Sequence, residues 1–160
     1  MKETISALLG EQVTKEFYSA YLYLAIANWF EENDLGGFGG WYLKQAEEEQ
    51  EHAMKIVEYL HDNGQSVQLG ALEAPRPEIG CVRDAVAAAL AHEKYITASI
   101  ENIYAAAVAE NDYRTQVFLQ WFITEQGEEE KNAEEMLTKV TRYGEHPMGI
   151  YNLDKEAAGR

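Results

Sequence analysis

Hydrophobic residues recur every three to four positions over four long stretches of this chain, the spacing of one apolar face on an α-helix. Each stretch ends at Asn, Asp or Gly, the residues that commonly stop a helix. A shorter stretch after Pro147 has room for one more helix. The predicted helices cover about residues 4–33, 38–63, 82–110, 113–143 and 150–158.

The segment between the second and third predicted helices, residues 65–81, has no helical period and contains Pro75 and Pro77. Fully extended, it could reach about 55 Å, at about 3.3 Å per residue. The preceding helix is only about 40 Å long, at about 1.5 Å per residue. The segment can therefore run back along a bundle and leave those two helices parallel. We expect an all-α fold in a single domain, residues 1–160: a four-helix bundle with one long crossover and a short C-terminal fifth helix.

Composition narrows the classes of partner. The 28 acidic and 13 basic residues give a net charge of −15, which argues against nucleic acid and anionic membranes as partners. Cys81 is the single cysteine, so an internal disulfide and a cysteine-cluster metal site are excluded. The first residues lack the apolar core of a signal peptide, and no apolar run approaches the roughly 20 residues of a membrane span. We expect a cytoplasmic protein.

Each long predicted helix carries one glutamate in phase with its apolar face. These are Glu16, Glu49, Glu93 and Glu129, and His52 follows Glu49 by one turn. Carboxylates on a core face are costly unless something compensates them, and acids here outnumber bases too far for salt bridges to do so generally. A bound cation can compensate them, and oxygen ligands with one imidazole favour iron or another first-row metal.

Position along the helices gives a second test of this site. Glu16 and His52 are equally far along the chain from the turn at Asp34, and Glu93 and Glu129 are equally far from the turn at Asn111. In antiparallel hairpins such residues lie at the same height. A set of buried or rim ion pairs without metal remains the alternative interpretation.

At these residues the chain resembles the ferritins, and among them the non-haem ferritins of prokaryotes. The resemblance extends over essentially the whole length and rests on the segments EFYSAYLYL, AEEEQEHAMK, HEKYIT, FLQWFITEQGEEEK and YNLDKE. It implies a ferritin-like fold and a di-iron ferroxidase centre within each subunit. Glu16, Glu49 and His52 match the ligands of one iron. Glu49, as a bridge, matches the second iron together with Glu93 and Glu129.

The same resemblance assigns further residues around the centre. Gln126 matches a position near the second iron, where it would bind or orient oxygen species. Tyr23 matches a tyrosine beside the centre that is a candidate electron donor.

A third, weaker iron site is also implied, formed by Glu129 with three acids that we call the outlying acids. The outlying acids are Glu48, Glu125 and Glu128. A solvated acidic face, the usual role of a run of charges, is the alternative for these three residues.

The implied function is iron storage: Fe(II) is oxidised by O2 or H2O2, and Fe(III) mineral fills a closed homo-oligomeric shell of roughly 24 subunits. Haem is not expected, because Gln50 stands where the haem-binding relatives carry methionine. Two other functions stay open from the sequence. One is a non-catalytic helical scaffold that buffers metal, and the other is a di-iron carboxylate enzyme with an organic substrate.

Overall fold

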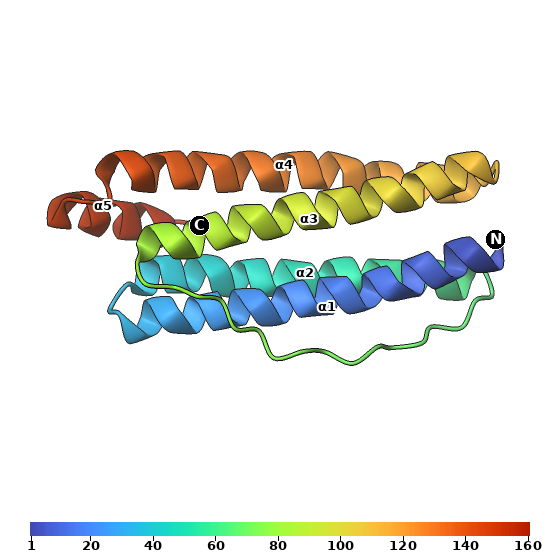
Figure 1. Ribbon diagram of the computed structural model, residues 1–160, viewed down its shortest axis with the longest axis horizontal. Helices are drawn as coiled ribbons and strands as arrows, with labels where there is room; N and C mark the ends of the chain where they lie inside the picture. Colours follow the sequence, from blue (N-terminus) through green and yellow to red (C-terminus); the bar gives the residue numbers. More distant parts are fainter.

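The computed structural model describes residues 1–160 and contains five helices and no strand, which confirms the all-α prediction. The long helices lie side by side, and the short last helix lies at one end of the bundle (Figure 1). The helices are α1 (Glu3–Glu32), α2 (Gly36–Asp62), α3 (Val82–Ala109), α4 (Tyr113–Tyr143) and α5 (Pro147–Ala157). None of them has the length and apolar character needed to cross a membrane.

The long helices form two antiparallel hairpins, because α1 packs chiefly on α2 and α3 chiefly on α4. Between α2 and α3 the chain follows the outside of the bundle from one end to the other, so that these two helices run parallel (Figure 1). The short α5 packs on α2 and α4. The turns within both hairpins use a left-handed residue, Asp34 with φ 58° and Asn111 with φ 54°.

Two helices begin earlier than the sequence predicted. α2 begins at Gly36, since the N–H of Phe38 in its first turn donates to Asp154 Oδ1 of α5 at 2.9 Å. Gly37 permits this contact, because a Cβ there would lie 1.8 Å from the Asp154 carbonyl oxygen. α5 begins at Pro147, a residue type suited to the first turn of a helix.

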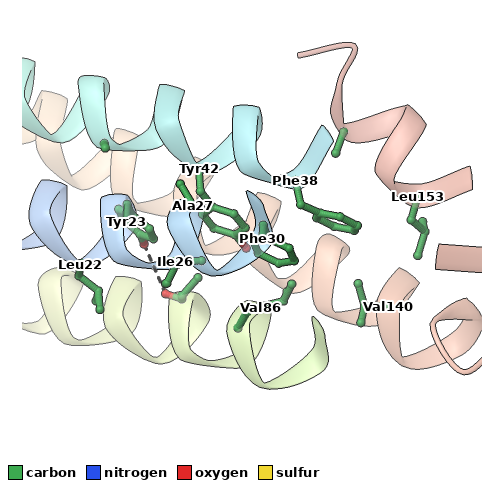
Figure 2. Close-up of a cluster of buried hydrophobic side chains, with 14 residues drawn as sticks. Leu22, Tyr23, Ile26, Ala27, Phe30, Phe38, Tyr42, Val86, Val140 and Leu153 are labelled. Atoms are coloured by element: carbon green, nitrogen blue, oxygen red, sulfur yellow. Dashed lines mark hydrogen bonds between the residues drawn. The ribbon is translucent and has the colours of Figure 1, made fainter. Parts of the chain in front are cut away.

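The interior contains two apolar clusters. One lies at the α5 end, where the rings of Phe30, Phe38 and Tyr42 stack with centroids 4.9 and 5.5 Å from that of Phe30 (Figure 2). The other lies toward the opposite end and includes Ile56 and Phe122. Each long helix contributes residues to both clusters, and the inward glutamate of each helix lies in the stretch between them.

Leu24 keeps the three-to-four spacing of the apolar residues of α1, which predicts an inward position, but it does not belong to the core. Leu24 is 38% exposed, whereas Tyr23 beside it is fully buried. Tyr23 takes the inward position because it packs on Tyr42 and reaches the polar layer with its hydroxyl group.

Candidate metal centre

A layer of buried polar side chains separates the two apolar clusters at mid-bundle. Every long helix contributes to it, so the site depends on the packing of all four. The side chains of this layer are at most 7% exposed, which leaves water little access to their charges. The residues are Glu16 of α1, Glu49 and His52 of α2, Glu93 of α3, and Gln126 and Glu129 of α4.

Two groups of side chains converge closely enough to share a cation. Atoms of Glu16, Glu49 and His52 lie within 4.8 Å of one another, and so do atoms of His52, Glu125 and Glu129. His52 belongs to both groups, and its Nδ1 lies 3.2 Å from Glu49 Oε2. The two candidate cation positions are therefore adjacent, on either side of the imidazole.

One oxygen of the first group has no partner. Glu16 Oε2 is buried and accepts no hydrogen bond, although Gln12 donates to the other oxygen of the same carboxylate at 2.8 Å. An unpaired buried carboxylate oxygen is costly, and a cation at this point would remove the cost. The donor set, carboxylate oxygens with one imidazole nitrogen, suits a divalent first-row metal such as iron.

Burial and mutual repulsion make these acids hard to ionise in the metal-free protein. Burial raises the pKa of Glu16, and the neighbouring Glu49 carboxylate raises it further. Burial and then Glu93 raise the pKa of Glu49, and the same two causes bring the pKa of Glu129 to about 7. A bound cation would favour the ionised forms, so metal binding and loss of protons are coupled.

Glu93 has different partners from those of the other glutamates. Tyr23 donates its hydroxyl proton to Glu93 Oε1, and Gln126 Nε2 donates to Glu93 Oε2 at 3.0 Å. Burial raises the pKa of Tyr23 far above 10, which keeps its phenol protonated and able to donate. Glu93 belongs to neither group of convergent atoms. The structure thus brings Tyr23 and Gln126 together at one carboxylate of the centre.

The outlying acids occupy three different surroundings. Glu125 joins the second group, with its Oε1 4.0 Å from His52 Nε2. Glu48 is half-exposed and forms an ion pair with Arg160 at 2.6 Å. Glu128 is exposed and belongs to neither group.

Two buried glutamines that were not among the predicted site residues, Gln12 and Gln45, complete the layer. Gln12 donates to Glu16, and Gln45 Nε2 donates to Glu129 Oε2 at 2.8 Å and to Glu49 Oε1 at 3.4 Å. The sequence did carry a signal for both, because each glutamine stands four residues before an inward glutamate. Residues at that spacing share one helix face.

Comparisons with known proteins agree with this architecture. The family model for ferritins, described as a ferritin-like domain, matches residues 6–143. The bacterial non-heme ferritin of Campylobacter jejuni is 35% identical over 155 residues, which cover 97% of this chain and 93% of that protein. The bacterial non-heme ferritin of Staphylococcus saprophyticus is 36% identical over 159 residues, covering 99% of this chain and 95% of the relative.

A solved structure extends the likeness to three dimensions. The open pore ferritin from the archaeon Archaeoglobus fulgidus superposes with a TM-score of 0.98 at 36% identity, over 100% of this chain and 98% of that chain. The resemblance indicated by the sequence is thereby confirmed over nearly the full length. The helix bundle with its long crossover has the fold of a ferritin, and the chain belongs to the ferritin family.

Proposed function

We propose that this protein is an iron-storage ferritin whose subunits oxidise Fe(II) within the four-helix bundle. One observation carries the proposal: four helices bury four glutamates and a histidine in a single layer, and an oxygen of Glu16 lacks any partner there. Buried acids at this density destabilise a metal-free bundle. They become favourable once cations occupy the layer.

In this proposal the centre binds two iron ions as substrate. Glu16, Glu49 and His52 hold the first ion, supported by the convergence of their atoms. Glu49 also reaches the second ion, which Glu93 and Glu129 complete. A carboxylate can bridge because each of its oxygens can bind a different cation. Two bound ions would thus stand close enough to give up electrons to one oxidant.

The chemistry follows from charge. Two Fe(II) ions give up one electron each, and this pair of electrons, with two protons from water, reduces O2 to H2O2 or H2O2 to two water molecules. The resulting Fe(III) is a harder cation that anionic oxygens stabilise more strongly. The proposed part of Tyr23 is to supply an electron, and that of Gln126 is to orient the oxidant. The contacts of both residues with Glu93 support these assignments.

A third iron site would lie where the second convergent group meets the outlying acids. Glu125 supports it, because it lies beside His52 and Glu129. With the remaining outlying acids, these carboxylates could accept iron as it leaves the centre. The chain's net charge of −15 would also attract cations to the protein.

The storage part of the proposal rests on the family. The relatives named above are ferritins along nearly the whole chain, and closed symmetry is the usual form of a large homo-oligomer. We infer a hollow shell of roughly 24 subunits that holds Fe(III) mineral. An enzyme with an organic substrate is disfavoured, because the cavity beside Glu93 and Glu129 measures ≈ 20 Å³, about the room of one water molecule.

The experiment combines size and loading. Light scattering on the purified protein should give the mass of a large closed shell. Aerobic addition of Fe(II) should then load many more iron ions than the binding sites can hold, without precipitation. A monomer or dimer under native conditions would remove the storage function. A shell that binds Fe(II) without oxidising it would favour the alternative function, a non-catalytic scaffold that buffers metal.

A further inference from the structure

A continuous set of hydrogen bonds connects Arg160, which lies just beyond the end of α5, with the metal centre. Arg160 Nη1 donates to Gln45 Oε1 at 2.9 Å and to the Trp41 carbonyl oxygen at 3.3 Å. Its Nη2 donates to Glu48 Oε2 at 2.6 Å, and the guanidinium group lies over the Trp41 ring, 4.4 Å from the centroid. Gln45 in turn donates to Glu129 and Glu49. The guanidinium group is therefore held by several contacts, and a single side chain, that of Gln45, lies between it and the carboxylates of the centre.

The chemistry of arginine determines which way the Gln45 amide faces. A guanidinium group carries donors and no acceptor, so only the carbonyl oxygen of Gln45 can meet it. The amide NH2 must then face the carboxylates of Glu49 and Glu129. Without Arg160, the amide could turn over and present its oxygen to Glu129, where two acceptors would repel each other. Gln45 alone fills the position, and Arg160 sets its direction.

The packing of α5 holds Arg160 in place. Leu153 of α5 lies at the end of the apolar cluster beyond Phe38 (Figure 2), and Asp154 accepts the hydrogen bond from the Phe38 N–H. Gly37 allows the two helices to approach closely enough for that bond. Arg160 therefore reaches Gln45 only while α5 is docked on α2.

The opposite side of the centre has an equivalent arrangement on α1. Gln12 donates to Glu16, its carbonyl oxygen accepts from Ser99 Oγ at 2.6 Å, and Lys15 Nζ donates to Ser99 Oγ at 2.8 Å. In both places a donor orients a glutamine that lies four residues before a glutamate of the centre. At Gln45 the donor is the cationic Arg160 itself, and at Gln12 it is Ser99, which accepts a hydrogen bond from Lys15. The repetition on two helices indicates that amide orientation matters to the centre.

We propose that Arg160 is a positioning residue for the metal centre. Through Gln45 it holds the Glu129 carboxylate, and more weakly that of Glu49, ready to bind iron, and it makes the second iron position depend on the docking of α5. This inference rests on the proposed function, because Arg160 would position ligands of the same iron centre.

The sign of the effect separates positioning from simple charge. A cation near a metal site repels the metal, so removing Arg160 should tighten metal binding if charge alone matters. Loss of a positioning contact should instead weaken binding, typically by 10- to 100-fold for groups that orient a ligand. Arg160→Gln removes the charge, and Arg160→Lys keeps both a charge and a donor for Gln45. Lys139→Gln is the matched control, because Lys139 pairs with Glu156 of α5 but has no contact with Gln45.

The probe is Co(II), titrated into the metal-free assembled protein and followed by its visible absorption. Wild type should bind two ions per subunit. We expect Arg160→Gln to weaken one of the two by on the order of 10-fold or more, with the other within about twofold. Arg160→Lys should recover most of the lost affinity, and Lys139→Gln should match wild type. In Fe(II) oxidation, Arg160→Gln should raise KM more than it lowers kcat.

Two further variants keep the test decisive. Gln45→Leu should weaken the same ion, and the double variant with Arg160→Gln should be no worse than Gln45→Leu alone, because both changes break one chain of contacts. Gly37→Ala, which moves α5 away, should resemble Arg160→Gln. Unchanged or tighter binding in Arg160→Gln, or additive losses in the double variant, would overturn the inference. Wild type that binds no Co(II) would instead contradict the proposed function.

Discussion

Replacing Glu129 with glutamine should stabilise the metal-free protein, and the gain should depend on pH. The Glu129 side chain is 7% exposed, and its surroundings raise its pKa from 4.5 to about 7. Glutamine has nearly the shape of the protonated acid and can still accept the hydrogen bond from Gln45 Nε2, which is 2.8 Å long in the wild type. The substitution therefore removes the cost of ionisation and little else.

The size of the gain follows from the linkage between proton binding and folding. Because the folded-state pKa of Glu129 is raised, the folded state binds more protons than the unfolded state between pH 4.5 and about 7. Wild-type stability consequently falls as pH rises through that window and stays lowered above it. At 1.36 kcal/mol per pKa unit the cost is about 3 kcal/mol at pH 8 and about 1 kcal/mol at pH 5. Glu129→Gln should recover these amounts.

The assay is urea unfolding of the metal-free protein at pH 8 and pH 5, followed by circular dichroism. Glu128→Gln on the same helix is the control, because it removes the same charge from an exposed position and should change the free energy of unfolding by less than about 0.5 kcal/mol. If Glu129→Gln destabilises the apo protein, or if its gain at pH 8 does not exceed its gain at pH 5, then ionisation of Glu129 does not cost the fold stability.

Three further predictions concern the reaction. Glu49→Ala should abolish rapid Fe(II) oxidation in stopped-flow absorbance, because this residue is proposed to bind both irons. His52→Ala should chiefly weaken the binding of one iron. Normal oxidation by Glu49→Ala would show that the glutamates have a structural role only. Replacing all three outlying acids with glutamine should leave two tightly bound irons per subunit but change the rate of later turnovers. Wild-type multi-turnover kinetics in this variant would show that these acids are only a solvated acidic face. Tyr23→Phe removes a hydrogen bond to Glu93 and should slow the first turnover while destabilising the apo protein by about 1–3 kcal/mol, measured by urea unfolding; an unchanged first-turnover rate would argue against electron donation by Tyr23.

The sequence identified the inward glutamates because two simple quantities locate a residue in a bundle. Helical phase determines which face a side chain occupies, and distance from a turn determines its height. Glu16, Glu93 and Glu129 satisfied both conditions, and Glu49 satisfied that of phase, with His52 one turn later at the height of Glu16. All four glutamates are buried at mid-bundle. The crossover could also be predicted from distance along the chain, because an extended segment longer than the preceding helix can run back along the whole bundle.

Contacts between helices could not be read in this way. Arg160 meets Gln45 only because α5 docks on α2, and that docking depends on the close approach at Gly37. The early start of α2 has the same origin, because Asp154 receives an N–H from the first turn. The side chain of Glu93 turns toward hydrogen-bond donors on α1 and α4, a choice that phase and height do not determine.

Anomalous diffraction at the iron edge would show whether the buried carboxylate layer binds two irons. Crystals of the metal-free protein would be soaked anaerobically in Fe(II) and compared with crystals of Glu49→Ala. We predict two iron peaks in each wild-type subunit, one among Glu16, Glu49 and His52 and one among Glu49, Glu93 and Glu129, with both weakened or lost in the variant. Iron found only at exposed acids, with the buried layer empty, would show that the layer is not an iron centre.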